Sequence, residues 1–204
     1  MNATELAARA PQAWRSGRVM LRTPGPADAA LLMDSFNASM PAFNYIHWTQ
    51  AREGRPFTLD EAAAVAGRLQ GYHQTGDSLH YLVQCADDTD APGAVAGLID
   101  LHSFDFATPR AEIGYTGDVR MAGRGLMTEA VVAVTQMAFS LGFVRVQALS
   151  DARNTSALRF AERLPGYQRE GVLHAFERDP WGLLCAQVMF AAVAPGALPQ
   201  PSNE

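Results

Sequence analysis

The feature that most constrains this chain is a glycine-rich turn between a strand-like run and an amphipathic helix. The run covers residues 111–119, and the turn reads Arg120-Met121-Ala122-Gly123-Arg124-Gly125. Beyond the turn, apolar residues recur with the period of a packed helix. They are Leu126, Ala130, Val134, Met137, Ala138 and Leu141, and Gly142 follows at the expected C-cap. The pattern therefore predicts that Gly123 and Gly125 lie at a strand-to-helix turn.

A glycine turn at the start of a helix is suited to bind phosphate. The helix N-terminus carries unpaired N–H groups and a partial positive charge, and glycines let a ligand approach the backbone closely. We therefore expect a cradle for a phosphate or pyrophosphate here. A Walker loop does not fit, because it needs a Gly-Lys-Ser/Thr sequence where this chain has Gly125-Leu126-Met127. A dinucleotide fingerprint does not fit either, because Thr128 stands in place of its third glycine.

Six sequence fragments resemble a known family. Arg120, Gly123 and Gly125 match the acyl-CoA-binding motif Gln/Arg-x-x-Gly-x-Gly/Ala of the GNAT N-acetyltransferase superfamily. Within it, the chain most closely resembles the ribosomal-protein serine/alanine N-terminal acetyltransferases. The fragments that carry this resemblance are, in order, Ile113-Gly114-Tyr115, Gly123-Arg124-Gly125, Thr128-Glu129-Ala130, Asn154, Gly166-Tyr167 and Glu170-Gly171. The resemblance covers about residues 17–194.

The order of the expected elements agrees with this resemblance. Periodicity and turn residues predict strands near 18–22, 79–85, 94–104, 111–119, 143–149, 167–177 and 182–193, and helices near 29–36, 58–72, 126–141 and 154–164. This order predicts an α/β (α+β) fold with a mixed, largely antiparallel central sheet flanked by helices, as in the GNAT fold. We expect residues 1–16 to form a short helix or a loose arm, 17–194 the acetyltransferase domain, and 195–204 a flexible, proline-rich tail.

The resemblance implies an acetyl-CoA-dependent N-acetyltransferase that moves an acetyl group to a primary amine by direct transfer. The favoured acceptor is the α-amine of a peptide or protein N-terminus, whose pKa of about 7.7–8.0 leaves part of it neutral near pH 7.5. A lysine amine, with a pKa of about 10.4, is almost entirely protonated there. A small-molecule amine is the alternative acceptor. The alternative of another class is a module that binds acyl-CoA without turnover.

The resemblance also implies roles for individual residues. Contacts with acetyl-CoA fall on Val119, Arg120, Met121, Gly123, Arg124, Gly125, Leu126, Met127 and Asn154. A backbone N–H near Val119 would hold the thioester carbonyl, and Asn154 would bind the pantetheine arm or only cap a helix. The family's catalytic glutamate, six residues after Gly171, corresponds to Glu177, which would accept the amine proton. Glu112, on the strand before the cradle, is the rival base.

The chain departs from the family pattern in two places. The family serine that is thought to protonate the leaving thiolate falls on Ala157, and Ser156 stands one place early, while Pro165 is an extra residue. Ser156 is therefore either a replacement acid or a helix-capping residue, and a thiol with a pKa of about 8.5 leaves fairly well without an acid. The expected acceptor wall is an irregular segment that carries Tyr45, His47 and Trp48, although packing of a loop explains these residues equally well.

Composition limits the other function classes. The 204 residues suit one domain, and the net charge of −5 argues against a broad nucleic-acid surface. No apolar run reaches the length of a membrane span and the N-terminus lacks a signal core, so we expect a cytoplasmic protein. Cys85 and Cys185 lie in apolar runs and should be core residues. The sequence leaves a homodimer open. We expect no metal site, because no ligand spacing relates the histidines at 47, 73, 80, 102 and 174.

Overall fold

The computed structural model describes residues 1–42, 55–87, 90–179 and 181–197. Within them the α-helices are α1 (Ala3–Arg9), α2 (Ala29–Ser39), α4 (Leu59–Thr75), α5 (Leu126–Leu141) and α6 (Thr155–Ala161). The strands are β1 (Ala13–Ser16), β2 (Val19–Arg22), β3 (Leu79–Cys85), β4 (Val95–Asp105), β5 (Arg110–Gly117), β6 (Arg145–Asp151), β7 (Gln168–Arg178) and β8 (Leu184–Val193). Short 3₁₀ turns are η1 (Pro26–Asp28), η2 (Met40–Ala42) and η3 (Val119–Met121). None of the helices in these residues is both long and apolar enough to cross a bilayer.

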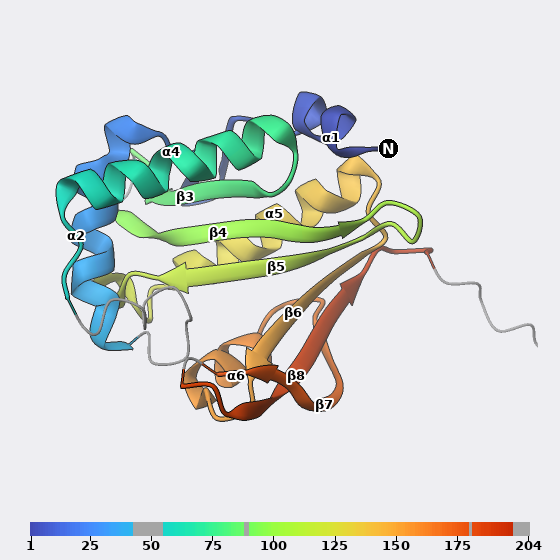
Figure 1. Cartoon of the computed structure of the whole chain (residues 1–204). Helices are drawn as coiled ribbons and strands as arrows, with labels where there is room; N and C mark the ends of the chain where they lie inside the picture. The colour runs from blue at the N-terminus through green and yellow to red at the C-terminus, as the bar shows by residue number, and fades with distance from the viewer. Residues whose placement is uncertain (43–54, 88–89, 180, 198–204) are drawn as a thin grey trace, which may run out of the picture.

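The strands form one mixed sheet in the order β1-β2-β3-β4-β5-β6-β8-β7. All neighbouring pairs are antiparallel except β5 and β6, which are parallel. The parallel pairing involves only residues 110–112 of β5 and 145–147 of β6. Beyond these residues the two strands diverge, so the sheet opens into two arms (Figure 1). The larger arm consists of β1 to β5, and the smaller arm consists of β6, β8 and β7. The largely antiparallel sheet flanked by helices that the sequence predicts is therefore confirmed.

Helices cover both faces of the larger arm. Helix α5 buries its apolar side against one face, and its buried residues join the main core with those of β3, β4 and β5. Helices α2 and α4 cover part of the opposite face through a smaller core (Figure 1), made of Leu32, Phe36, Phe57, Ala66, Leu82 and Val95. Complete burial of such side chains contributes about 1.5–3 kcal/mol each, so both helix layers are firmly attached to the sheet.

The helix ends follow the expected capping residues. Thr58 and Glu61 form the predicted capping box: the Glu61 N–H donates to Thr58 Oγ1 at 3.3 Å and the Thr58 N–H donates to Glu61 Oε2 at 2.8 Å. Gly142 ends α5 in the left-handed region, at φ 105°. Cys85 and Cys185 are both buried and free of disulfides, as expected.

The N-terminal segment differs from the expectation of a short helix or a loose arm. The helix α1 is present, but residues 13–16 form β1 and pair antiparallel with β2. Gly17, at φ 54°, permits the tight turn between these strands. Leu6 is fully buried in the main core, so this segment packs onto the rest of the molecule.

Strand β5 ends at Gly117, two residues before the expected end at position 119, because the next residues enter η3.

Candidate active site

The gap between β5 and β6 is bordered by an edge of β5 that pairs with no other strand among the described residues. The Asp118 N–H donates to the Ala96 carbonyl at 2.9 Å, continuing the β4–β5 register. Antiparallel neighbours alternate between hydrogen-bonded and non-bonded pairs, so every second residue of β5 directs its N–H and C=O away from β4. Beyond the short pairing with β6, the residues whose backbone groups face the gap are Ile113, Tyr115 and Gly117. Such an edge can pair with an extended ligand that carries amide groups.

The expected phosphate cradle lies at the end of this edge. Gly123 and Gly125 both adopt φ 77°, a left-handed conformation that L-residues rarely take. Helix α5 starts at Leu126, and Gly125 supplies no side-chain cap, so the first N–H groups of the helix remain available to a ligand. A Cβ at Gly123 would meet no atom within 4 Å, so this side of the turn is open. Positive dipole and open space together suit a phosphate group.

Residues just before the cradle contact the protein itself. Arg120 Nη2 lies 2.6 Å from Asp118 Oδ2 and 2.8 Å from Asp34 Oδ2, which joins the turn to α2. Burial opposes ionisation of Asp118, but the hydrogen bonds from Arg120 outweigh it and lower the pKa of Asp118. The Val119 N–H, which we expected to face the thioester, donates to Ser39 Oγ at 3.1 Å. The unpaired edge of β5 is therefore the better source of a donor for the thioester carbonyl.

An ionic cluster occupies the α2–α4 side of the sheet. His102 on β4 lies between two carboxylates, with Nδ1 at 2.6 Å from Asp100 Oδ2 and Nε2 at 3.4 Å from Glu112 Oε1. Hydrogen bonds to Asp100 and Glu112 raise the pKa of His102 to about 10 despite its partial burial, so the imidazole is cationic at neutral pH. Asp100 lies over Gly114, where a Cβ would come within 2.7 Å of its Oδ1. A side chain at position 114 would therefore displace the Asp100 carboxylate.

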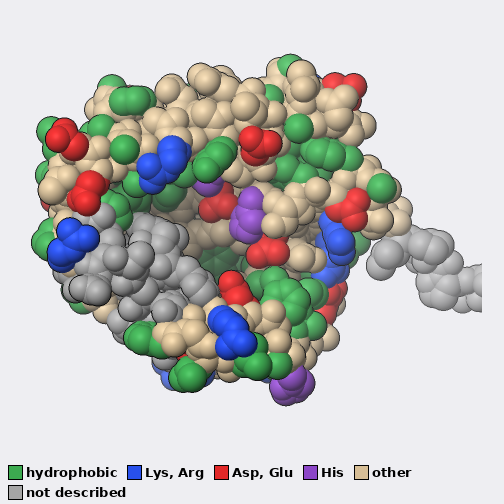
Figure 2. Space-filling model, in the orientation of Figure 1, with side chains coloured by type: hydrophobic (Ala, Val, Ile, Leu, Met, Phe, Trp, Pro, Cys, Tyr) green, Lys and Arg blue, Asp and Glu red, His purple; other side chains and the backbone are tan. Residues whose placement is uncertain are grey.

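Glu112 stands where the two arms of the sheet separate. It lies opposite Gln147 in the last paired position of β5 and β6. His102 contacts its Oε1, and Gln147 Nε2 donates to its Oε2 at 3.4 Å. The carboxylate is thus held from β4 and from β6 at the apex of the gap. Figure 2 shows a hollow on this face of the molecule, with acidic and histidine side chains gathered in it.

Sequence comparison decides the family. Residues 18–165 match the family model of the acetyltransferase (GNAT) domain. The protein belongs to the GNAT acetyltransferase family. Its members transfer acetyl groups from acetyl-CoA, so acetyl-CoA is the co-substrate of this GNAT protein. No curated protein matches the sequence.

Solved structures share the GNAT fold at low sequence identity. The microcin C7 self-immunity acetyltransferase MccE, solved with acetyl-CoA and AMP, is 20% identical and has a TM-score of 0.75, over 87% of this chain and 93% of MccE. An acetyltransferase from Salmonella typhimurium that modifies the N-terminal serine of ribosomal protein L7/L12 is 19% identical, with a TM-score of 0.72 over 91% and 98%. The ribosomal-protein-S5-alanine acetyltransferase from Vibrio fischeri is 16% identical, with a TM-score of 0.70 over 92% and 99%.

The residues of this GNAT protein fit acetyl-CoA. The start of α5 offers N–H groups to the pyrophosphate, and the turn at Gly123 leaves room for it. The free edge of β5 can pair with the amide groups of the pantetheine arm. Bound there, acetyl-CoA would supply an activated acetyl group to the gap between the arms. Among the described residues, no group of three or more His, Cys, Asp or Glu side chains is arranged to hold a metal ion.

The predicted catalytic residues Ser156 and Glu177 and the predicted cofactor-binding residue Asn154 lie on the smaller arm. Asn154 caps α6, its Oδ1 accepting from the Ala157 N–H at 3.1 Å, and Ser156 is exposed in the first turn of that helix. Glu177 is exposed on β7, and Gln187 Nε2 donates to its Oε2 at 3.1 Å. The structure brings these residues to the β7–β8 side of the gap, apart from the cluster at Glu112. Tyr45, His47 and Trp48 lie outside the described residues.

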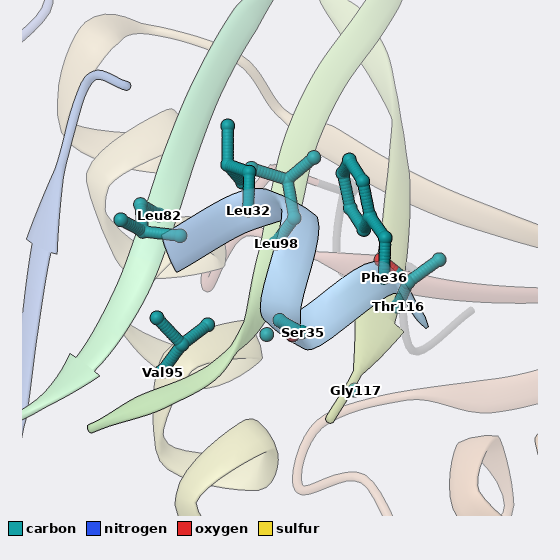
Figure 3. Close-up of a pocket in the computed structure, with 9 residues that line it drawn as sticks. Leu32, Ser35, Phe36, Leu82, Val95, Leu98, Thr116 and Gly117 are labelled. Atoms are coloured by element: carbon teal, nitrogen blue, oxygen red, sulfur yellow. The ribbon is translucent and has the colours of Figure 1, made fainter. Parts of the chain in front are cut away.

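An apolar pocket lies between α2 and the sheet (Figure 3). Its empty volume, including the part open to solvent, is about 210 Å³. Lining residues come from α2, β3, β4 and β5, among them Phe36, Leu98 and Gly117. A Cβ at Gly97 would collide with the Thr116 carbonyl and approach Met127 Sδ to 2.7 Å, so glycine keeps β4 close to β5 here.

Sequence reasoning missed Asp100, His102 and Gln147 as parts of the site. The sequence does contain a signal for Asp100 and His102: they are ionisable residues two apart in a largely apolar strand, so they share one face of the sheet. Their partner Glu112 lies on the next strand, directly opposite His102. No pattern in the sequence indicates Gln147, because its place depends on the parallel pairing of β5 with β6.

Proposed function

We propose that this GNAT acetyltransferase acetylates the α-amine at a peptide or protein N-terminus. The observation that carries the proposal is the ionic cluster of Asp100, His102 and Glu112 at the apex of the gap. With His102 protonated, the cluster has one excess negative charge, which attracts an ammonium group and offers a carboxylate to its proton. An α-amine needs only a weak base, because its pKa is about 7.7–8.0. The resemblance to ribosomal-protein N-terminal acetyltransferases supports the same acceptor.

The transfer is a single displacement at the thioester carbonyl. The neutral amine attacks the carbonyl carbon, the new C–N bond forms, and the C–S bond breaks to release the CoA thiolate. The amine proton passes to a carboxylate of the protein, and the thiolate takes a proton from solvent. The N–H groups of Tyr115 and Gly117 face the gap, so they are the donors available to the oxygen that gains negative charge.

Two carboxylates compete for the role of base. Glu112 lies on β5 three residues before Tyr115, about 10 Å along the strand, so an amine near Tyr115 would pass its proton to Glu112 along a chain of bound water molecules. Glu177 has the position that the family motif implies, but it lies on the outer strand β7 and contacts Gln187. The contacts therefore favour Glu112, and Glu177 stays the proposal drawn from the motif.

A pair of isosteric variants separates these two bases. Glu112→Gln and Glu177→Gln each keep the side-chain shape and remove the charge. Loss of a general base lowers turnover by about 10²–10⁴-fold, whereas acetyl-CoA affinity should stay the same. We expect this loss in Glu112→Gln. A large loss in Glu177→Gln alone would return the role to Glu177, and full activity in both variants would exclude each as the base.

The acceptor class is tested with matched peptides. Short peptides that contain lysine are offered with a free or a blocked N-terminus, beside a panel of small amines, and thiol release is measured. We expect turnover only on the free N-terminus. Equal rates on free and blocked peptides would indicate lysine as the acceptor. Activity confined to small amines would replace the proposal with a small-molecule acetyltransferase.

A further inference from the structure

We propose that Arg18 is a positioning residue for acetyl-CoA, because it holds the peptide unit that presents the Gly125 N–H to the cradle. The inference depends on the cradle binding the pyrophosphate, but not on the identity of the acceptor or of the base. It concerns a residue outside the glycine motif, about a hundred positions earlier in the chain, that the fold brings to the turn before α5.

The β1–β2 hairpin carries Arg18 to the cradle. Ser16 pairs with Val19, so Gly17 and Arg18 form a two-residue turn, and the positive φ of Gly17 suits its first central position. The hairpin touches α5 closely, because a Cβ at Gly17 would lie only 3.0 Å from Glu129 Oε2. Arg18 is therefore fixed against the first turn of α5 by the chain on both sides of it.

The Glu129 carboxylate binds both the backbone N–H and the guanidinium of Arg18. The Arg18 backbone N–H donates to Glu129 Oε2 at 3.0 Å, and its Nε donates to Oε1 at 2.7 Å. Nη2 lies 2.5 Å from Glu129 Oε1 and also donates to the Arg124 carbonyl at 3.1 Å. Because the planar guanidinium has fixed donor directions, binding it to Glu129 also fixes where Nη2 meets the cradle turn.

The contact between Arg18 and the Arg124 carbonyl fixes the direction of the Gly125 N–H. The Arg124 carbonyl and the Gly125 N–H belong to one planar trans peptide unit, so they point in opposite directions. Holding the carbonyl toward Arg18 therefore turns the Gly125 N–H to the opposite side of the turn. Gly125 can follow because it has no side chain: a Cβ there would lie 3.3 Å from Arg18 Nη2. The resulting left-handed φ of 77° at Gly125 is the conformation that leads into α5.

The same contact balances charge near the phosphate. Glu129 stands in the first turn of α5, where its carboxylate would repel a bound pyrophosphate. Arg18 neutralises it, and the helix N-terminus keeps its net attraction for anions. Nε and Nη2 are directed to Glu129 and to the Arg124 carbonyl, so Arg18 acts through the cradle backbone, where N–H groups bind the phosphate.

The test compares Arg18→Met with Arg110→Met. Met keeps most of the aliphatic volume and removes the donors, and Arg110 is a similarly exposed arginine at the far end of β5, paired with Asp105. Calorimetry with acetyl-CoA should show a dissociation constant raised about tenfold in Arg18→Met, the effect of losing one hydrogen bond of about 1.4 kcal/mol. Arg110→Met should bind acetyl-CoA like the unmodified protein.

A second measurement separates positioning from general support of the fold. In glycine-labelled protein, saturating acetyl-CoA should shift the Gly125 amide resonance, and this shift should be lost or much reduced in Arg18→Met while Gly123 still responds. Where Arg18→Met folds poorly, Arg18→Lys serves, because one compact ammonium cannot reach both Glu129 and the Arg124 carbonyl. An unchanged dissociation constant, or a Gly125 shift as large as in the unmodified protein, would overturn the proposal.

Discussion

The ionic cluster at the apex of the gap should make the free energy of unfolding depend on pH. His102 binds its proton more tightly in the folded chain than in the unfolded one, because Asp100 and Glu112 raise its pKa from 6.5 to about 10. Its contribution to the free energy of unfolding is therefore complete below about pH 6.5 and disappears as the pH rises to about 10. We expect the protein to lose stability across this range, and the loss to depend on His102.

The magnitude follows from the same pKa difference. Without screening, a rise from 6.5 to about 10 would correspond to about 5 kcal/mol. The His102 side chain is 36% exposed, so solvent weakens its attraction to both carboxylates. We therefore expect about 1–2 kcal/mol, above the range of a fully exposed ion pair and well below the unscreened value.

Urea unfolding of the unmodified protein and of His102→Gln at pH 6 and pH 9.5 measures this contribution. Between the two pH values, the free energy of unfolding should fall by about 1–2 kcal/mol more in the unmodified protein than in His102→Gln. His174→Gln, which changes an exposed histidine on β7, is the matched control and should follow the unmodified protein. Equal losses in the unmodified protein and His102→Gln would refute the reasoning, as would an NMR titration of His102 with a midpoint near 6.5.

Substitutions at Gly97 on β4 and at Gly125 in the cradle test the backbone there, and Gly71 in α4 serves as a control. Gly97→Ala should lower the free energy of unfolding by about 1–3 kcal/mol in urea, because its Cβ meets the Thr116 carbonyl and Met127 Sδ; Gly71→Ala, in open space within α4, should instead raise it by up to about 1 kcal/mol. Gly125→Asp should raise the dissociation constant for acetyl-CoA more than a hundredfold, about 3 kcal/mol, since it adds a carboxylate where the anion binds; unchanged affinity in a folded variant would move the pyrophosphate elsewhere.

Local sequence signals were enough to predict the elements that the site needs. The capping box at Thr58, the apolar period after Leu126 and the terminal Gly142 each describe interactions within a few residues of chain, and each is present in the structure. The glycine turn was predicted for the same reason, because positive φ values and a helix start are local properties. Periodicity and turn residues gave the order of the elements along the chain, and the family resemblance added the expectation that they form the GNAT fold.

Long-range contacts account for what the sequence did not reveal. Strand β1 is four residues long and gains stability from its pairing with β2, so it has too little pattern of its own to be recognised. The expected donor at Val119 faces Ser39, which is 80 positions earlier in the chain. His102 and Glu112 come together because β4 and β5 pair in one particular register. A shift of that register by one residue would turn one of them to the other face.

Two arginines contact opposite ends of the cradle turn, and their combined effect explains why the glycine motif alone is an incomplete description of the site. Before the turn, Arg120 joins Asp118 to Asp34 and fixes η3 against α2. After it, Arg18 joins Glu129 to the Arg124 carbonyl. Both contacts direct an acceptor group toward an arginine of the protein, so carbonyl and carboxylate oxygens are drawn away from the ligand side. N–H groups would then be left to face the pyrophosphate that we propose binds here, which is the arrangement that an anion requires. Glycine permits this conformation, and the arginines select it.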